Sequence, residues 1–172
     1  IGALYISSKL KKSMISQIHG GGQQFNLRSG TLNVPGIIGM GKAADIALEE
    51  MEADSRKIKE LRDQLENSLL KISDTFINCN KDNRIFNTTN ICFSKVNSEQ
   101  MILSLGNTCV SSGSACNATT SKPSHVLKAM GMSDLDALSS IRFSLGKFTT
   151  RSEIEMAIDK IGKIVLQLRK ES

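Results

Sequence analysis

The side chain best suited to covalent chemistry is a thiol in the segment CVSSGSACNATT, residues 109–120. Cys116 follows serines, a glycine and an alanine, and such a composition favours turns and an exposed, mobile loop. A cysteine kept for packing normally sits in an apolar periodic pattern, which is missing here. The residues alone leave two interpretations open: a reactive thiol that travels on its loop, or a structural cysteine.

Two arginines could bind anions. Arg142 lies in the strand-like segment SSIRFSLG, where alternation places it on the same face as Ser140 and Ser144. A guanidinium flanked by hydroxyls is a suitable fork for a carboxylate, although an ordinary exposed strand arginine shows the same pattern. Arg28 opens the segment RSGT, which offers a cation, two hydroxyls and a flexible glycine. These groups could contact a phosphate.

The other cysteines and the histidines predict no further chemistry. Cys79, Cys92 and Cys109 lie in or beside strand-like segments, so we expect them in the core or in strands. No cysteine pair has zinc-finger or C-x-x-C spacing, and His19 and His125 are not placed to complete a site. We expect no metal site, and we expect the histidines to be surface or packing residues.

A long helix and a loop rich in glycine are predicted to position these groups. Residues 1–10 alternate like a strand, and residues 17–36 are rich in Gly, Ser and Asn. From Ile37 to about Ile72, apolar residues recur at intervals of three and four, which predicts one helix. At 1.5 Å per residue, that helix would be roughly 50 Å long and would bridge two layers or domains.

Beyond the long helix, short strands and helices alternate. We expect strands at 75–80, 89–94, 108–112 and 139–146, and helices at 98–105 and 123–131. The final helix has the clearest signature, because Thr150 and Glu153 have the spacing of a capping box ahead of an apolar stripe. The alternation predicts a compact α/β domain with helices packed on a small sheet.

Composition excludes some classes of function. The net charge is +5, but the basic residues are spread along the chain and aromatic residues make up only 4%, which disfavours nucleic-acid binding. The longest apolar run is too short to span a membrane, and no signal peptide is visible, so we expect reduced thiols in a cytosol-like compartment. The chain opens without methionine inside a strand-like run, so we expect it to be the back portion of a longer protein.

Four motifs, HGGGQ, RSGT, SSGSAC and SSIRFSLGKFTT, resemble in order and spacing the C-terminal part of a cysteine desulfurase of the IscS/NifS type. The resemblance covers essentially the whole chain. That family belongs to the class-V aminotransferases, which are fold-type-I pyridoxal-phosphate (PLP) enzymes. The resemblance implies that residues 1–50 form the tail of the large PLP-binding domain and the start of the long helix. Residues 51–172 would form the small C-terminal α/β domain that carries the cysteine loop.

The resemblance also implies roles for single residues. Cys116 would take sulfur from L-cysteine and carry it as a persulfide to an acceptor, such as an iron–sulfur scaffold protein, or toward tRNA thiolation. Arg142 would pair with the carboxylate of L-cysteine. Thr31, with Arg28 beside it, would contact the PLP phosphate of the opposite subunit in a homodimer. The composition, which leans to Lys, Ile and Asn, favours the bacterial cytoplasm over the mitochondrial matrix, and we expect no direct contact with nucleic acid or membrane.

The chain departs from the family pattern in three ways. Gln24 replaces a glutamate, which keeps hydrogen bonding and loses a charge, and Asn26 replaces a glycine, although Asn tolerates left-handed backbone angles. The family's Schiff-base lysine stands before the GIGALY stretch, and Lys9, Lys11 and Lys12 come too late to match it. We therefore expect no desulfurase turnover from this chain alone. Two rival interpretations are a related selenocysteine lyase and a non-catalytic module that binds a partner and uses Cys116 as a contact or redox thiol.

Overall fold

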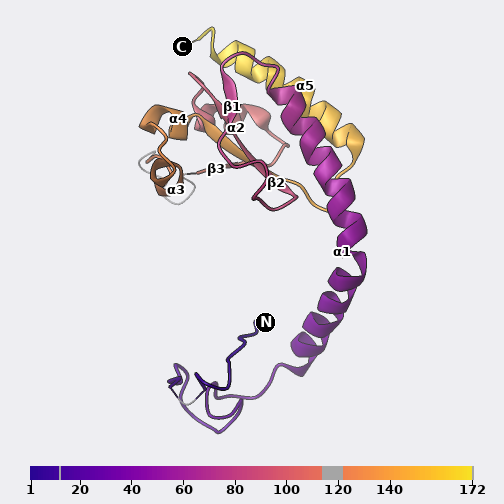
Figure 1. Cartoon of the computed structure of the whole chain (residues 1–172), viewed down its shortest axis with the longest axis vertical. Helices are drawn as coiled ribbons and strands as arrows, with labels where there is room; N and C mark the ends of the chain where they lie inside the picture. Colours follow the sequence, from indigo (N-terminus) through magenta and orange to yellow (C-terminus); the bar gives the residue numbers. More distant parts are fainter. Residues whose placement is uncertain (12, 114–121, 172) are drawn as a thin grey trace. The chain divides into compact units, whose positions relative to one another are not determined.

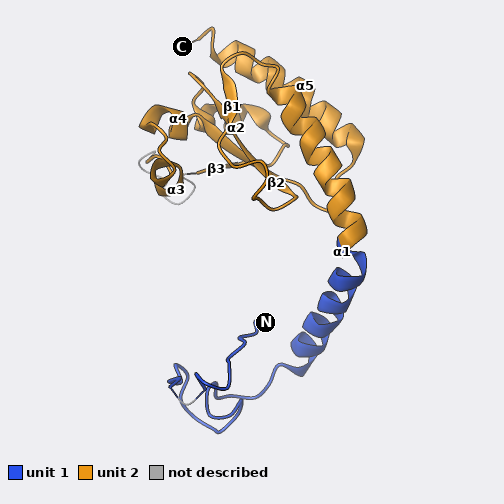
Figure 2. Cartoon of the chain, in the orientation of Figure 1, with its two compact units in different colours: residues 1–51 blue, residues 52–172 orange. Residues whose placement is uncertain are grey.

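The computed structural model describes residues 1–11, 13–113 and 122–171. The chain divides into two compact units, residues 1–51 and 52–172, which are coloured separately in Figure 2. Helix α1, Val34–Leu69, begins in the first unit and ends in the second (Figure 1). The predicted long helix is thereby confirmed, with both ends about three residues earlier than the sequence pattern indicated.

The first unit contains little regular structure before α1. The strand expected over residues 1–10 is wrong, because no described segment pairs with it; the backbone N–H groups of Leu10 and Lys11 instead bond to the carbonyl of Ser7 in a turn. Helix α1 starts where Asn33 Oδ1 accepts a hydrogen bond from Gly36 N at 3.1 Å. Pro35 follows in the first helical turn, where its missing N–H costs no helical hydrogen bond.

The second unit is built around one antiparallel sheet. Among the described residues four strands pair in the order β1-β2-β4-β3. Their bounds are β1 Thr75–Ile77, β2 Thr88–Phe93, β3 Ser111–Ser112 and β4 Ser140–Ser144. The helices beside α1 are α2 Ser98–Leu105, α3 His125–Ala129, α4 Asp134–Leu138 and α5 Arg151–Leu168. Each predicted strand after residue 72 is present: β1, β3 and β4 are shorter than expected, and β2 has the expected length but begins one residue earlier.

The core of this unit lies on one face of the sheet. Ile91 and Phe93 of β2 and Ile141 and Phe143 of β4 point to that face and are buried, and the rings of Phe93 and Phe143 meet edge to face with centroids 6.4 Å apart. The C-terminal half of α1, labelled with α5 in Figure 1, contributes apolar side chains to the same core as α5 and α2. The core therefore fixes the register of the central strands.

Helix ends follow the capping chemistry in the sequence. The predicted capping box of α5 is confirmed, with Thr150 Oγ1 accepting from Glu153 N and Thr150 N donating to the Glu153 carboxylate. Asn97, rather than Ser98, caps α2 by accepting from two backbone N–H groups. Helix α4 was not expected, although Ser133 at its start, accepting from Asp136 N, is an ordinary N-cap signal.

Candidate functional site

Arg142 lies on the sheet face opposite to the one that α1 covers. Thr89, which precedes Asn90 on β2, is buried and donates to Glu66 of α1 at 2.6 Å, so the alternate residues of β2 and β4 face the other way. Arg142 and Ser144 are exposed while their neighbours Ile141 and Phe143 are buried. The face predicted for Arg142 is confirmed.

The open face carries a transverse row of polar residues. Asn90 of β2 is directly opposite Arg142 of β4, and Ser111 of β3 is opposite Arg142 on its other side. Asn78, just beyond β1, extends the row, because its backbone N–H donates to the carbonyl of Asn90 at 2.9 Å. Residues that face each other across a ladder share one side of the sheet. Strands β2 and β3 and the residue just beyond β1 thus each place one polar side chain in line with the guanidinium.

Among the described residues, most donors of the Arg142 guanidinium have no hydrogen-bond partner. Its one hydrogen bond within the described part of the chain runs from Nη2 to Ser111 Oγ at 3.4 Å, and the side chain is exposed. Ser140 departs from the sequence expectation, since it is fully buried on this face and donates to the carbonyl of Asp136 at 2.6 Å. Helix α4 therefore covers Ser140 and leaves Arg142 and Ser144 accessible.

Cys116 lies outside the residues that the structure describes, so its role stays a prediction. The described flanks of its segment meet at the edge of the sheet. A Cβ added at Gly113 would lie 2.5 Å from Ser124 Cβ, so only glycine fits there. Ser111, two residues before Gly113, pairs in register with Arg142. The segment that contains Cys116 is thus tied at its start to the strand next to Arg142.

The three described cysteines, Cys79, Cys92 and Cys109, are free. Cys92 is buried with its sulfur 3.5 Å from the carbonyl of Asp136, and burial raises the pKa of its thiol to about 11. Cys79 is half-buried and accepts from Arg84 at 3.4 Å. Cys109 is exposed, which corrects the core prediction, because β3 begins only at Ser111. Burial makes Cys92 the least reactive of the three.

Arg28 and Thr31 lie in the first unit, in the loop that follows the three glycines. Both are exposed, and Arg28 Nη1 donates to the carbonyl of Gly30 at 3.3 Å. Ser29 instead is buried and donates to the carbonyl of Gly21 at 2.6 Å, so its hydroxyl proton serves the loop rather than a ligand. An exposed guanidinium and an exposed hydroxyl are suitable hydrogen-bond donors for a phosphate.

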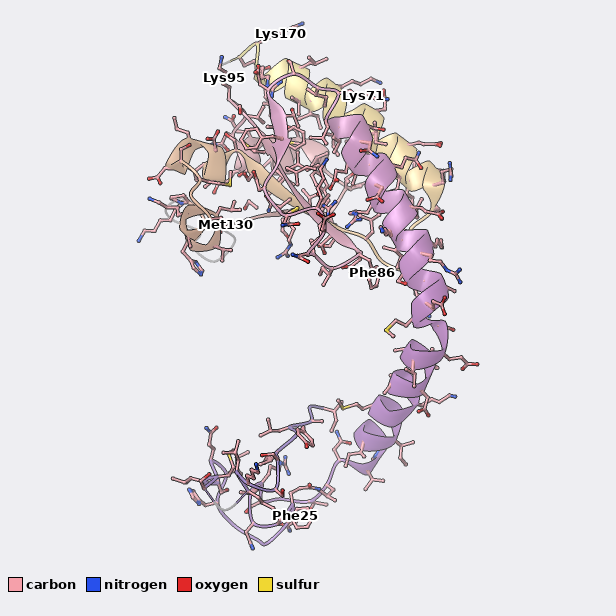
Figure 3. The ribbon with its side chains drawn as sticks, in the orientation of Figure 1. Phe25, Lys71, Phe86, Lys95, Met130 and Lys170 are labelled. Atoms are coloured by element: carbon pink, nitrogen blue, oxygen red, sulfur yellow. The ribbon has the colours of Figure 1, made fainter. Side chains whose placement is uncertain are left out.

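The two substitutions in this loop are accommodated. Asn26 adopts φ +63°, the left-handed conformation expected where the family has glycine. Gln24 and Phe25 also have positive φ, at 50° and 59°. Lys11 Nζ lies 3.8 Å from the centroid of the Phe25 ring, which is labelled in Figure 3. The cation over the ring and the run of left-handed residues together define the turn without a glycine.

Sequence reasoning missed a buried ion pair behind the sheet. Arg84 forms two hydrogen bonds to the Glu66 carboxylate, at 2.5 and 2.9 Å, and side chains of both residues are 10% exposed or less. Burial alone would raise the pKa of Glu66, but the hydrogen bonds from Arg84 and Thr89 and the charges of Arg84 and Arg62 together lower it below 4.5. No motif marks the pair, because its partners come from a helix and a loop.

The described residues contain no group of three or more His, Cys, Asp or Glu side chains close enough to hold a metal ion. Within the same residues, no helix is both long and apolar enough to cross a bilayer. His19 and His125 are both exposed.

Comparisons with known sequences agree on one family. The pattern of the family described as aminotransferase class-V matches residues 1–156. Cysteine desulfurase IscS of Shewanella loihica is 44% identical over 172 residues, which is 100% of this chain and 43% of the relative. Cysteine desulfurase IscS of Klebsiella pneumoniae subsp. pneumoniae is 45% identical over 172 residues and is likewise covered to 43%. The chain spans less than half the length of these curated relatives.

Solved structures give the same result. A NifS-like protein from Rickettsia africae matches with a TM-score of 0.77 and 36% identity, over 87% of this chain and 39% of that protein. A further NifS-like protein matches with a TM-score of 0.75 and 33% identity, over 88% of this chain and 39% of the other. These likenesses confirm the expected α/β fold class.

Proposed function

Since the chain belongs to the class-V aminotransferase family, we propose that the whole protein is a PLP-dependent cysteine desulfurase that converts L-cysteine to L-alanine. The observation that carries this proposal is Arg142, an exposed guanidinium with a single hydrogen bond recorded among the described residues. A strand holds the residue on a face that α1 does not cover. An exposed, planar guanidinium with donors available can form two parallel hydrogen bonds to the carboxylate of an amino acid.

Within this proposal the two proposed domains have separate tasks. Residues 1–50 contribute to the large PLP-binding domain, where Thr31 and Arg28 donate to the cofactor phosphate across a homodimer. Residues 51–172 form the small domain, in which Arg142 orients the substrate. Pyridoxal phosphate, when bound, supplies the electron sink that allows the carbon–sulfur bond of an amino acid to break.

Cys116 is the proposed sulfur carrier. Its thiolate attacks the sulfur of L-cysteine, and a sulfur–sulfur bond forms as the carbon–sulfur bond breaks. The electron pair stays with the carbon fragment, which takes up a proton and leaves as L-alanine. The persulfide on Cys116 then passes its outer sulfur to an acceptor. Support comes from the motif SSGSAC and from the pairing of Ser111, five positions earlier, with Arg142.

The proposed setting follows from the relatives. Curated relatives of the chain include the bacterial IscS proteins of Shewanella and Klebsiella. We place the protein in the bacterial cytoplasm, as a homodimer that delivers sulfur to iron–sulfur cluster assembly or to tRNA thiolation through acceptor proteins.

Substitution of Arg142 tests the substrate assignment. In the whole protein loaded with PLP, Arg142→Ala should raise KM for L-cysteine roughly ten- to hundredfold, because a hydrogen-bonded charge pair is lost. Arg142→Lys should restore only part of the affinity, since an ammonium lacks the two-donor fork. Arg151→Ala, at an exposed arginine at the start of α5, is the matched control. An Arg142→Ala enzyme with the original KM would show that the guanidinium does not hold the substrate.

A further inference from the structure

The polar row on the open sheet face points to a second residue for the substrate carboxylate. We propose that Asn90 donates a hydrogen bond to that carboxylate beside Arg142, and that Asn78 is the positioning residue that fixes the amide of Asn90. This inference rests on the proposed function, because it takes Arg142 as the carboxylate fork. It adds to that site a neutral donor, Asn90, and the residue that positions it, Asn78.

Strand register brings Asn90 and Arg142 close together. Leu145 N donates to the Asn87 carbonyl and Phe93 N donates to the Ser139 carbonyl, both at 2.9 Å. Hydrogen-bonded and non-hydrogen-bonded pairs alternate along an antiparallel ladder. Asn90 opposite Arg142 therefore falls on a non-hydrogen-bonded pair, in which Cα atoms approach to about 4.5 Å and side chains are nearest.

The contact from Asn78 sets the orientation of the Asn90 amide. Asn78 Nδ2 donates to Asn90 Oδ1 at 2.7 Å, so the side-chain oxygen of Asn90 faces Asn78, at the end of β1. The oxygen and nitrogen of a planar amide diverge, and Asn90 Nδ2 is therefore turned away from Asn78. No partner for this nitrogen is recorded among the described residues, and Asn90 is half-buried rather than enclosed. It remains a donor for a ligand.

The contact between Asn78 and Asn90 also keeps the donors of the Arg142 guanidinium available for a ligand. If Asn90 Oδ1 faced Arg142, it would accept from the guanidinium and use donors that the ligand needs. With Oδ1 held by Asn78, the pair presents only donors: the fork of Arg142 and the N–H₂ group of Asn90. A carboxylate has two oxygens and about four acceptor positions, so it can take all of them.

Asn78 is built as a support. It is 8% exposed, and its Nδ2 also donates to Ser140 Oγ at 2.8 Å, which in turn donates to the carbonyl of Asp136. Its own Oδ1 is buried and has no hydrogen-bond partner in the described structure. An unsatisfied buried oxygen is unfavourable, and an apolar residue would avoid it. Retaining an amide here is explained if its N–H₂ group is needed to orient Asn90.

The test uses the whole protein loaded with PLP and two readouts. Asn90→Ala should raise KM for L-cysteine roughly tenfold, as one hydrogen bond to a charged group is lost, with kcat changed far less. Asn90→Asp should raise KM further, because its carboxylate pairs with Arg142 and repels the ligand. Calorimetric affinity for the product L-alanine should fall by the same factors. Asn78→Ala should give a smaller rise, because it only loosens the amide.

Thr88→Ala is the matched control, because Thr88 lies on the same face of β2, two residues from Asn90 and opposite Ser144. We expect it to leave KM and L-alanine affinity unchanged. A folded Asn90→Ala enzyme with unchanged KM and affinity would overturn the inference. If that variant does not fold, Asn90→Asp replaces it, because it keeps the shape of the side chain. An unchanged KM and an unchanged affinity for L-alanine in Asn90→Asp would then overturn the inference. An effect of Arg142→Ala without one at Asn90 rejects only this inference, whereas no effect at either residue rejects the proposed function.

Discussion

At the scale of single residues, Glu66 and Arg84 form a buried ion pair in the second unit. Replacing Arg84 with Ala leaves a buried carboxylate, and we expect the free energy of unfolding to fall by about 3–5 kcal/mol, measured by urea denaturation. The exposed pair of Arg56 and Glu52, whose side chains are 72% and 86% exposed, supplies the control. Arg56→Ala should cost at most about 1 kcal/mol. Equal losses from both variants would contradict the account.

The same pair predicts a pH dependence. The pKa of Glu66 is lower in the folded chain than its ordinary value of 4.5. The contribution of the pair to stability is therefore fully present above the unfolded pKa and is lost as pH falls through the folded pKa. The difference in unfolding free energy between the original chain and Glu66→Gln should accordingly shrink below about pH 4. A difference that stays constant down to acid pH would show that Glu66 is not ionised in the pair.

Some single-residue features could be predicted from sequence and others could not. The left-handed conformation of Asn26 follows from a local preference, and the exposure of Arg142 follows from alternation along one strand. The contacts of Glu66 with Arg84 and of Asn78 with Asn90 join segments that approach only in the folded chain. Local patterns carry no information about such pairs.

At the scale of elements, the start of α5 is the clearest case of a sequence signal with a measurable energy. Thr150→Ala removes the oxygen that accepts from Glu153 N, and unfolding should become easier by about 1 kcal/mol. Glu155→Ala, at an exposed position of the same helix, should stay within about 0.5 kcal/mol of the original chain. Thermal or urea unfolding of both variants measures the difference, and no loss on Thr150→Ala would argue against the cap.

Elements were predictable where the signal was local. The apolar stripe and capping box identified α5, and three- and four-residue spacing identified α1. The five-residue helix α4 is too short for a periodic stripe, so its N-cap was the only usable sign. Residues 1–10 alternate like a strand, but a strand also needs a partner, and alternation does not say whether one is present.

At the scale of the whole molecule, four motifs spread from residue 19 to residue 150 are sufficient to identify the family. They do not reveal the transverse row, which depends on the register of four strands and on the packing that fixes it. Only the folded sheet places Asn90 beside Arg142.

The measurement that tests the central claim most directly is the mass of the Cys116 peptide. The whole protein, loaded with PLP and incubated with L-cysteine, is digested without reductant and analysed by mass spectrometry. We predict that this peptide gains the mass of one sulfur atom, that L-alanine appears in step with it, and that incubation with L-alanine instead gives no gain. An unmodified Cys116 during turnover, or a Cys116→Ser enzyme that still delivers sulfur to an acceptor, would contradict the account.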